Sequence, residues 1–270
     1  MTAPLFAFRL RPLAEIVPWP GPDGPGLSWF GLTDGWYWMN VGGQQLFRYN
    51  VHDGDGTAWS RYCDYQVARL FDDLTDLVPG ALAAVPRQLH PFLSGDMAMS
   101  WRGYWDAWCS LPDRFPEMDA LDRVLWEAGE LYRLRTLDTF YLQPSTDILM
   151  WSSSDQVHIQ WDNRGKMVDG APAWTAAQGS LALTRDRFIA EVRNFCVRLC
   201  DAMEERIRQV EQGALAPDIH VDLKKLNLEQ ELRRYQLDHV LANPRYTDDW
   251  PAITAAVEKL ERLRSRYQSS

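Results

Sequence analysis

Long apolar runs and patterned cysteines are both missing from this 270-residue chain. No apolar stretch approaches the roughly 20 residues that a membrane-spanning helix needs. The first residues, MTAPLFAFRLRPLAEIVPW, lack a basic segment followed by an apolar one. The four cysteines, Cys63, Cys109, Cys196 and Cys200, form no CxxC pair and no spacing typical of a disulfide framework. We therefore expect a cytoplasmic protein with reduced thiols and no association with a membrane.

An excess of positive charge is also missing. The chain carries 28 Lys and Arg against 37 Asp and Glu, which gives a net charge of −9 and an isoelectric point near 5.1. A negative surface repels nucleic acid and anionic lipid, so neither is an expected partner. Two interpretations of the acidic residues stay open: ordinary solvated faces, or an acidic surface that meets a basic protein.

Motifs for cofactors, metals and phosphates are missing as well. The sequence has no GxGxxG, GxxxxGK[ST], GxSxG or HExxH segment, and no Cys and His cluster at zinc spacing. We therefore expect no cofactor and no metal site. Of the five histidines, His158 is the most interesting, because it shares a predicted strand face with Gln160 and Asp162. An imidazole beside a carboxylate can act as a general base; the alternative is the polar, solvated side of a half-buried sheet.

Tryptophan, by contrast, is abundant, with 13 residues that gather in clusters. Each large aromatic side chain buries ~150–250 Å², so such clusters mark core positions or a binding face. Trp101, Tyr104, Trp105 and Trp108 recur at i, i+3, i+4 and i+7, which predicts one side of a helix. Core packing is the favoured interpretation of this set, and stacking on sugars is the alternative.

Alternating patterns predict antiparallel strands in two regions, near 27–50 and 147–183. In the first, runs at 27–33, 36–41 and 44–50 are separated by Asp34-Gly35 and Gly42-Gly43, which predicts a three-stranded meander. Trp36 and Trp38 are two residues apart and therefore lie on one face of their strand. In the second region, strands are predicted at 147–154, 156–163 and, for the SLALT segment, 180–184. Residues 5–17 are expected to form a first strand or an extended entry segment.

Helices are predicted between and after these strand groups, and together they give an α+β fold in which antiparallel strands pack against helices. The best helix begins after Thr184 as N-cap, and Asp249 is expected to cap the last one. We divide the chain into an α+β domain, 1–212, and a C-terminal helical extension, 213–270, packed on the same domain. The predicted helices lie at 62–77, from 101, at 121–131, from 185, at 227–241 and at 250–267.

Two stretches carry a resemblance to a known family. LSWFGLTDGWYWMNVG at 27–42, and VHIQWDNRGK at 157–166 running on to the DRFIAEVRNFCVRLCDAMEERI helix, resemble an uncharacterised bacterial family, a domain of unknown function. The resemblance covers about residues 5–212, and its WFGLTDG run is the more specific signature. The order strand–WDN–loop–Trp–long helix is also similar in style to bacterial immunity proteins, which bind and block a cognate toxin.

Two functional hypotheses follow. The first is a binding protein, an immunity or antitoxin-type inhibitor that neutralises a basic bacterial toxin by stoichiometric contact, because an inhibitor needs shape and charge but no reactive group. Its candidate contact residues are Asp34, Trp36, Trp38, His158, Asp162 and Asn163. The second is an unrecognised hydrolase with its site around His158 and Asp162.

Overall fold

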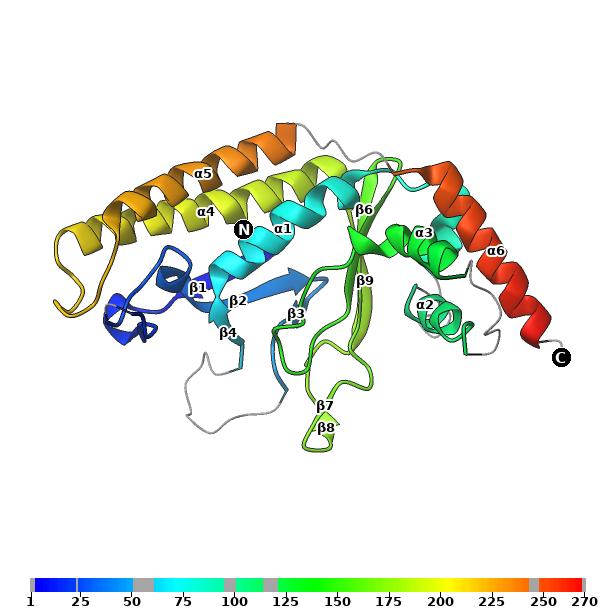
Figure 1. Ribbon diagram of the computed structural model, residues 1–270, viewed down its shortest axis with the longest axis horizontal. Helices are drawn as coiled ribbons and strands as arrows, with labels where there is room; N and C mark the ends of the chain where they lie inside the picture. The colour runs from blue at the N-terminus through cyan, green and yellow to red at the C-terminus, as the bar shows by residue number, and fades with distance from the viewer. Residues whose placement is uncertain are drawn as a thin grey trace.

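The computed structural model describes residues 3–22, 24–50, 61–94, 101–113, 121–242 and 248–268. Two antiparallel sheets form the centre of the molecule, and helices cover them on two sides (Figure 1). Helices α1, α4 and α5 lie side by side over the first sheet, and α2, α3 and α6 gather at the opposite end. The predicted α+β class is confirmed.

The first sheet is built around one long central strand, β2 (Asp34–Val41). Its neighbours all run antiparallel to it: β1 (Phe6–Leu10), β3 (Gln44–Leu46) and β4 (Cys63–Gln66). The turn predicted at Gly42-Gly43 is confirmed, and both glycines have positive φ, 55° and 85°, the backbone that a two-residue hairpin needs. The expected entry strand is β1.

The first strand of the predicted meander is wrong. Residues Gly31–Thr33 form a short 3-10 helix, η2, and Asp34-Gly35 is not a turn but the start of β2. Gly35 lies opposite Leu10 of β1, and a Cβ on it would sit 2.3 Å from the carbonyl oxygen of Arg9. Glycine is therefore present because two backbones approach closely there, a need that looks the same in the sequence as a turn.

The second sheet has the order β5-β6-β9, and its strands agree with the prediction. They are β5 (Ile148–Ser153), β6 (Gln156–Asp162) and β9 (Gln178–Thr184). A small hairpin, β7 (Met167–Val168) with β8 (Ala171–Pro172), lies between β6 and β9 in the chain. Because β6 occupies the middle, β9 is an edge strand.

The larger hydrophobic core lies between the sheets and three helices: α1 (Val67–Leu82), α4 (Arg185–Glu211) and α5 (Leu223–Ala242). Thr184 caps α4 as predicted, since its hydroxyl accepts a hydrogen bond from the Arg187 N–H at 3.3 Å. The helix predicted at 62–77 begins later, because the preceding residues form β4. Cys196 and Cys200 are buried in this core, and burial raises the pKa of both thiols, that of Cys200 to about 11.

A second core joins α2 (Trp101–Cys109), α3 (Leu121–Arg133) and α6 (Trp250–Gln268) to the short helix η3 (Arg87–Phe92). Trp101 and Trp108 are buried in it, as the core interpretation predicts. Asp249 caps α6 through a 3.1 Å bond from the Ala252 N–H. Strand β5 contributes Trp151 to this core and Met150 to the larger one, so it lies between the two. None of the described helices is both long and apolar enough to cross a bilayer.

Candidate functional site

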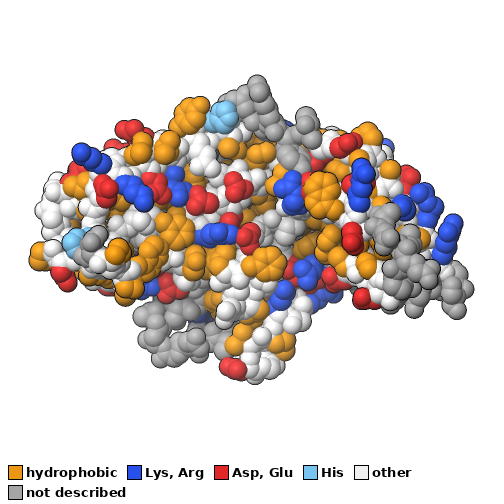
Figure 2. Space-filling view, viewed as in Figure 1, with side chains coloured by type: hydrophobic (Ala, Val, Ile, Leu, Met, Phe, Trp, Pro, Cys, Tyr) orange, Lys and Arg blue, Asp and Glu red, His pale blue; other side chains and the backbone are white. Residues whose placement is uncertain are grey.

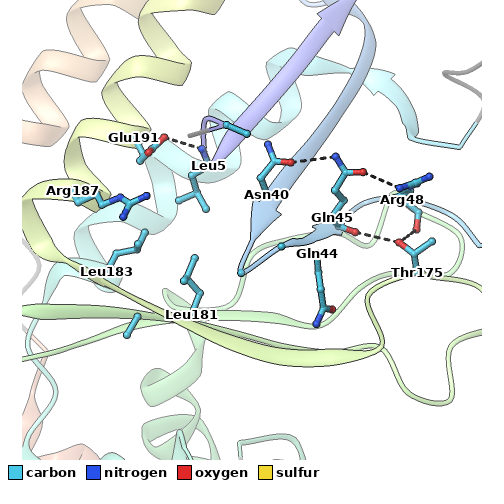
Figure 3. A pocket seen from close by; sticks show the side chains of 14 residues that line it. Leu5, Asn40, Gln44, Gln45, Arg48, Thr175, Leu181, Leu183, Arg187 and Glu191 are labelled. Carbon is cyan, nitrogen blue, oxygen red and sulfur yellow. Dashed lines mark hydrogen bonds between the residues drawn. The ribbon is translucent and has the colours of Figure 1, made fainter. Parts of the chain in front are cut away.

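The largest cavity among those described, about 690 Å³, opens where the two sheets meet (Figure 3). The hairpin between β2 and β3 forms one wall, strand β9 forms the floor, and the first turns of α4 form the other wall. The residues that line it come from 40–48, 175, 181–183, 187 and 191, together with Ala3 and Leu5. We call this cavity 1.

Polar side chains on the hairpin wall are held by a chain of hydrogen bonds. The Tyr62 hydroxyl donates to Gln45 Oε1 at 3.0 Å, and Arg48 Nη1 donates to the same oxygen at 3.1 Å. Gln45 Nε2 in turn donates to Asn40 Oδ1 at 3.2 Å (Figure 3). This wall therefore presents fixed amide groups, which is the preorganisation that a recognition surface needs.

Guanidinium groups stand on both sides of cavity 1. Arg187 of α4 is exposed, and its guanidinium has no partner among the described residues. On the hairpin wall, Arg48 Nε is buried and likewise has no partner in the described parts of the chain. Glu191 is committed to structure, because its carboxylate accepts the Leu5 N–H at 2.8 Å. The cavity thus keeps donor capacity for a ligand.

A second cavity, about 370 Å³, lies on the other face of β9, and we call it cavity 2. His158 and Gln160 of β6 line it together with Ser94 and residues 178–182 of β9. Gln160 is only 6% exposed, and its Oε1 has no partner among the described atoms. A buried acceptor without a partner favours a ligand or water that donates a hydrogen bond there.

His158 is held in place by its neighbours. Its imidazole stacks on Trp151 at 4.3 Å, and His90 contacts the same indole at 4.9 Å. Its Nε2 lies 2.8 Å from the Ser153 hydroxyl. Burial, and to a smaller degree the charge of His90, lowers the pKa of His158 below its ordinary value of 6.5. The imidazole is therefore neutral at physiological pH.

The first three candidate contact residues lie on the outer face of β2. Asp34 accepts a hydrogen bond from Arg11 Nε at 2.9 Å, and the guanidinium carbon of Arg11 lies 4.4 Å from the Trp36 ring. Trp36 is buried as a result, with 9% of its surface exposed. Trp38 is half-buried and packs on Tyr62 at 4.7 Å, so it adjoins the hydrogen-bonded wall of cavity 1.

The other three candidates lie on or just after β6, but they are not close together. His158 and Asp162 are four residues apart on an extended strand, roughly 13 Å at ~3.3 Å per residue. Asp162 binds Arg164 through two hydrogen bonds, at 3.0 and 2.9 Å. Asn163 is buried, and its amide donates to Ala176 and accepts from the Asp147 N–H. His158 and Asp162 therefore do not contact each other, and the hydrogen-bond neighbour of His158 is Ser153.

The strand predicted at 180–184 is β9, but sequence reasoning did not include it in the candidate site, although this strand separates the two cavities. Its signal is weak: the segment QGSLALT looks like any short strand, and nothing in it shows that it lies at an edge. The described residues contain no group of three His, Cys, Asp or Glu side chains able to hold a metal ion. On the face shown in Figure 2, acidic and basic side chains are interspersed.

The fold and the site together define an α+β protein whose concave surface carries polar side chains on both sides of an edge strand. A family model described as "Family of unknown function (DUF5984)" matches residues 5–256, and the chain therefore belongs to this family. The match is longer than the resemblance over 5–212, since it includes α5 and the start of α6. Neither the curated proteins nor the solved structures contain a match.

Proposed function

We propose that this protein acts by stoichiometric binding, as an immunity or antitoxin-type inhibitor that neutralises a bacterial protein toxin. The observation that carries the proposal is cavity 1, with its fixed amides and with Arg187 and the Nε of Arg48 without partners among the described residues. A surface of this kind offers hydrogen bonds and charge to a partner, which is what stoichiometric recognition requires.

Charge and aromatic surface add to the proposal. The net charge of −9 speeds association with a basic toxin through electrostatic steering. Trp38 is half-exposed and packs on Tyr62, whose hydroxyl bonds to Gln45 in the wall of cavity 1, so it fits the role of an aromatic anchor. Asp34, Asp162 and His158 are the other candidates with exposed surface, whereas buried Trp36 and Asn163 support their neighbours.

The test is protection from a toxin encoded beside this gene. Co-expression with each neighbouring gene product shows whether growth is rescued and whether a complex of defined stoichiometry is recovered. We expect Arg187→Glu to weaken the complex at least tenfold, while Arg193→Glu, the same charge change at another exposed position of α4, leaves it unchanged. If no neighbouring product is toxic, or if toxicity is unaffected by this protein, the proposal is wrong.

A second candidate function has one observation in its favour. The Ser153 hydroxyl lies 2.8 Å from His158 Nε2, the arrangement in which a neutral imidazole takes the proton of a serine nucleophile. We propose this pair as the site of the hydrolase alternative in place of His158 with Asp162. Turnover of any ester or amide in a broad substrate panel, lost in Ser153→Ala and in His158→Ala, supports it, and inactivity of the native protein over the whole panel rejects it.

A further inference from the structure

Strand β9 has one side bonded to β6 and one side open. The register pairs Val157 with Leu183 and Ile159 with Leu181. Just beyond the two ends of the ladder, the Arg185 N–H bonds to the Asp155 carbonyl and the Asn163 N–H to the Ala177 carbonyl. Antiparallel pairs alternate between bonded and non-bonded. Odd-numbered residues of β9 therefore bond to β6, and the backbone groups of the even-numbered ones point outward.

The outward groups belong to Gln178, Ser180 and Ala182. All three residues are exposed, and none of their backbone N–H and C=O groups has a partner in the described parts of the chain. Natural proteins normally protect such an edge with lysine, proline, an inward charge or a bulge. The seven residues of β9, QGSLALT, contain no charge and no proline. An unprotected edge is the template to which another extended chain adds.

The surroundings of β9 restrict what can add to it. Cavity 1 lies on the face of Leu181 and Leu183, and cavity 2 lies on the face of Ser180 and Ala182. A strand that pairs with β9 directs alternate side chains to these two faces, one set into each cavity. The hairpin at Gly42–Gln45 and the first turns of α4 stand beside this edge and line cavity 1 together with β9 (Figure 3).

We infer that β9 is a strand-addition site that binds an extended peptide segment of the partner protein, with an acidic side chain of that segment placed in cavity 1. The acidic side chain is assigned from Arg187, which is exposed and has no partner among the described residues. Cavity 2 carries no charged side chain in its lining and takes small or polar side chains beside Gln160. The inference rests on the proposal that the protein acts by binding, and it names where and how.

One substitution separates the strand edge from the rest of the fold. Ala182→Pro removes an outward N–H, and it leaves the bonds between β9 and β6 in place because Ala182 is not one of the bonded positions. Ala182→Ser is the matched control, since it keeps the N–H and changes the side chain little. Ser180→Pro provides a second variant of the same kind. Circular dichroism and the urea unfolding midpoint of each variant establish that it is folded.

The probe is a phage-displayed library of random seven-residue peptides, selected on the full-length protein. We expect the selected peptides to carry Asp or Glu at one alternating set of positions and to bind Ala182→Pro at least tenfold more weakly, with Ala182→Ser unchanged. Bound peptide is also expected to slow amide hydrogen exchange at Ser180 and Ala182. We expect Arg187→Glu to weaken the binding of these peptides and Arg193→Glu to leave it unchanged.

Several results overturn the inference. It fails if the library yields no peptide, or if the folded proline variants bind the selected peptides as well as the native protein does. A native protein that is dimeric, with a monomeric Ala182→Pro, shows that a second copy occupies the edge instead. A toxin that native protein and Ala182→Pro neutralise equally overturns strand addition and retains the proposed function. Peptide binding at β9 without any cognate toxin supports strand addition and contradicts the proposed function.

Discussion

Trp29 Nε1 donates a 2.8 Å hydrogen bond to Gln230 Oε1 and so joins two residues that are 201 positions apart. Gln230 Nε2 donates in turn to the Cys200 carbonyl at 2.7 Å, and the guanidinium of Arg233 lies 4.2 Å from the Trp29 ring. One amide therefore connects α5 to α4 and to the segment before η2. The family match, which continues to residue 256, includes α5 as well.

Replacing this amide should destabilise the whole fold. We expect Gln230→Leu to lower the free energy of unfolding by about 2–4 kcal/mol, because the buried Trp29 N–H loses its partner and the Cys200 carbonyl of α4 loses a second hydrogen bond. Urea denaturation measures the loss. The neighbouring Glu231→Gln, at an exposed position, should change it by less than about 0.5 kcal/mol. Equal stabilities of the two variants would contradict this role of Gln230.

A methyl group at Gly179 should be costly for a different reason. Gly179 lies opposite Trp161 in the second sheet, and a Cβ there would sit 2.3 Å from the indole carbon Cζ2. We expect Gly179→Ala to lower the unfolding free energy by about 1–3 kcal/mol, since the indole is buried and must shift against its neighbours to make room for the methyl group. Ser180→Ala, one residue along the same strand, is the control. A fully stable Gly179→Ala would show that the indole does not cover this strand.

The stability of the protein should fall as the pH rises through the acidic range because of Asp73. Burial is the main cause that raises the pKa of Asp73 to about 7, against the opposing effect of Arg69. The native state therefore holds this proton more tightly than the unfolded state does. Its contribution is fully present below about pH 4 and is lost by about pH 7.

The measurement is urea unfolding of native protein and Asp73→Asn at several pH values. We expect the unfolding free energy of the native protein, relative to that of the variant, to decrease between pH 4 and 7 by roughly 2–4 kcal/mol and to be level above that range. Asp186→Asn, the same substitution at an exposed position of α4, is the control for this comparison. A difference that increases with pH would mean that the paired Arg69 outweighs burial.

His158 offers a direct spectroscopic check on cavity 2. Because burial lowers its pKa, its NMR titration midpoint should lie below 6.5. In His90→Asn the midpoint should rise slightly, since the charge of His90 is the smaller cause, and it should still lie below 6.5. A midpoint at or above 6.5 in the native protein would mean that the imidazole is more exposed than its stacking on Trp151 implies.

Local patterns predicted much of the fold. The alternation of β6 is seen in the burial of Val157, Ile159 and Trp161, and Gly42-Gly43 and Thr184 have the turn and cap roles expected of them. Each of these features depends on residues close in sequence. The turn predicted at Asp34-Gly35 is wrong because the glycine is required by the close approach of β1. This strand lies 24 or more residues earlier in the chain than the Asp34-Gly35 pair, so no neighbouring residue reveals the contact.

The candidate site was harder to predict. His158 lines one cavity, and Trp38 packs on Tyr62, whose hydroxyl bonds to Gln45 in the wall of cavity 1. Trp36 is covered by Arg11, and the amide of Asn163 bonds to loop backbone. Cavity 1 is assembled from the β2–β3 hairpin, β9 and α4, and its hydrogen bonds cross between elements that no local pattern relates.

The sequence by itself determined the α+β class, the strand and helix periods and the acidic charge, because these follow from residue spacing and composition. Only the tertiary structure decided that β9 lies at an edge, with Ser180 and Ala182 directed outward between two cavities. The reason is physical: a strand has the same alternation in the middle of a sheet as at its border, and the order of strands depends on how the buried surfaces of the whole chain fit together.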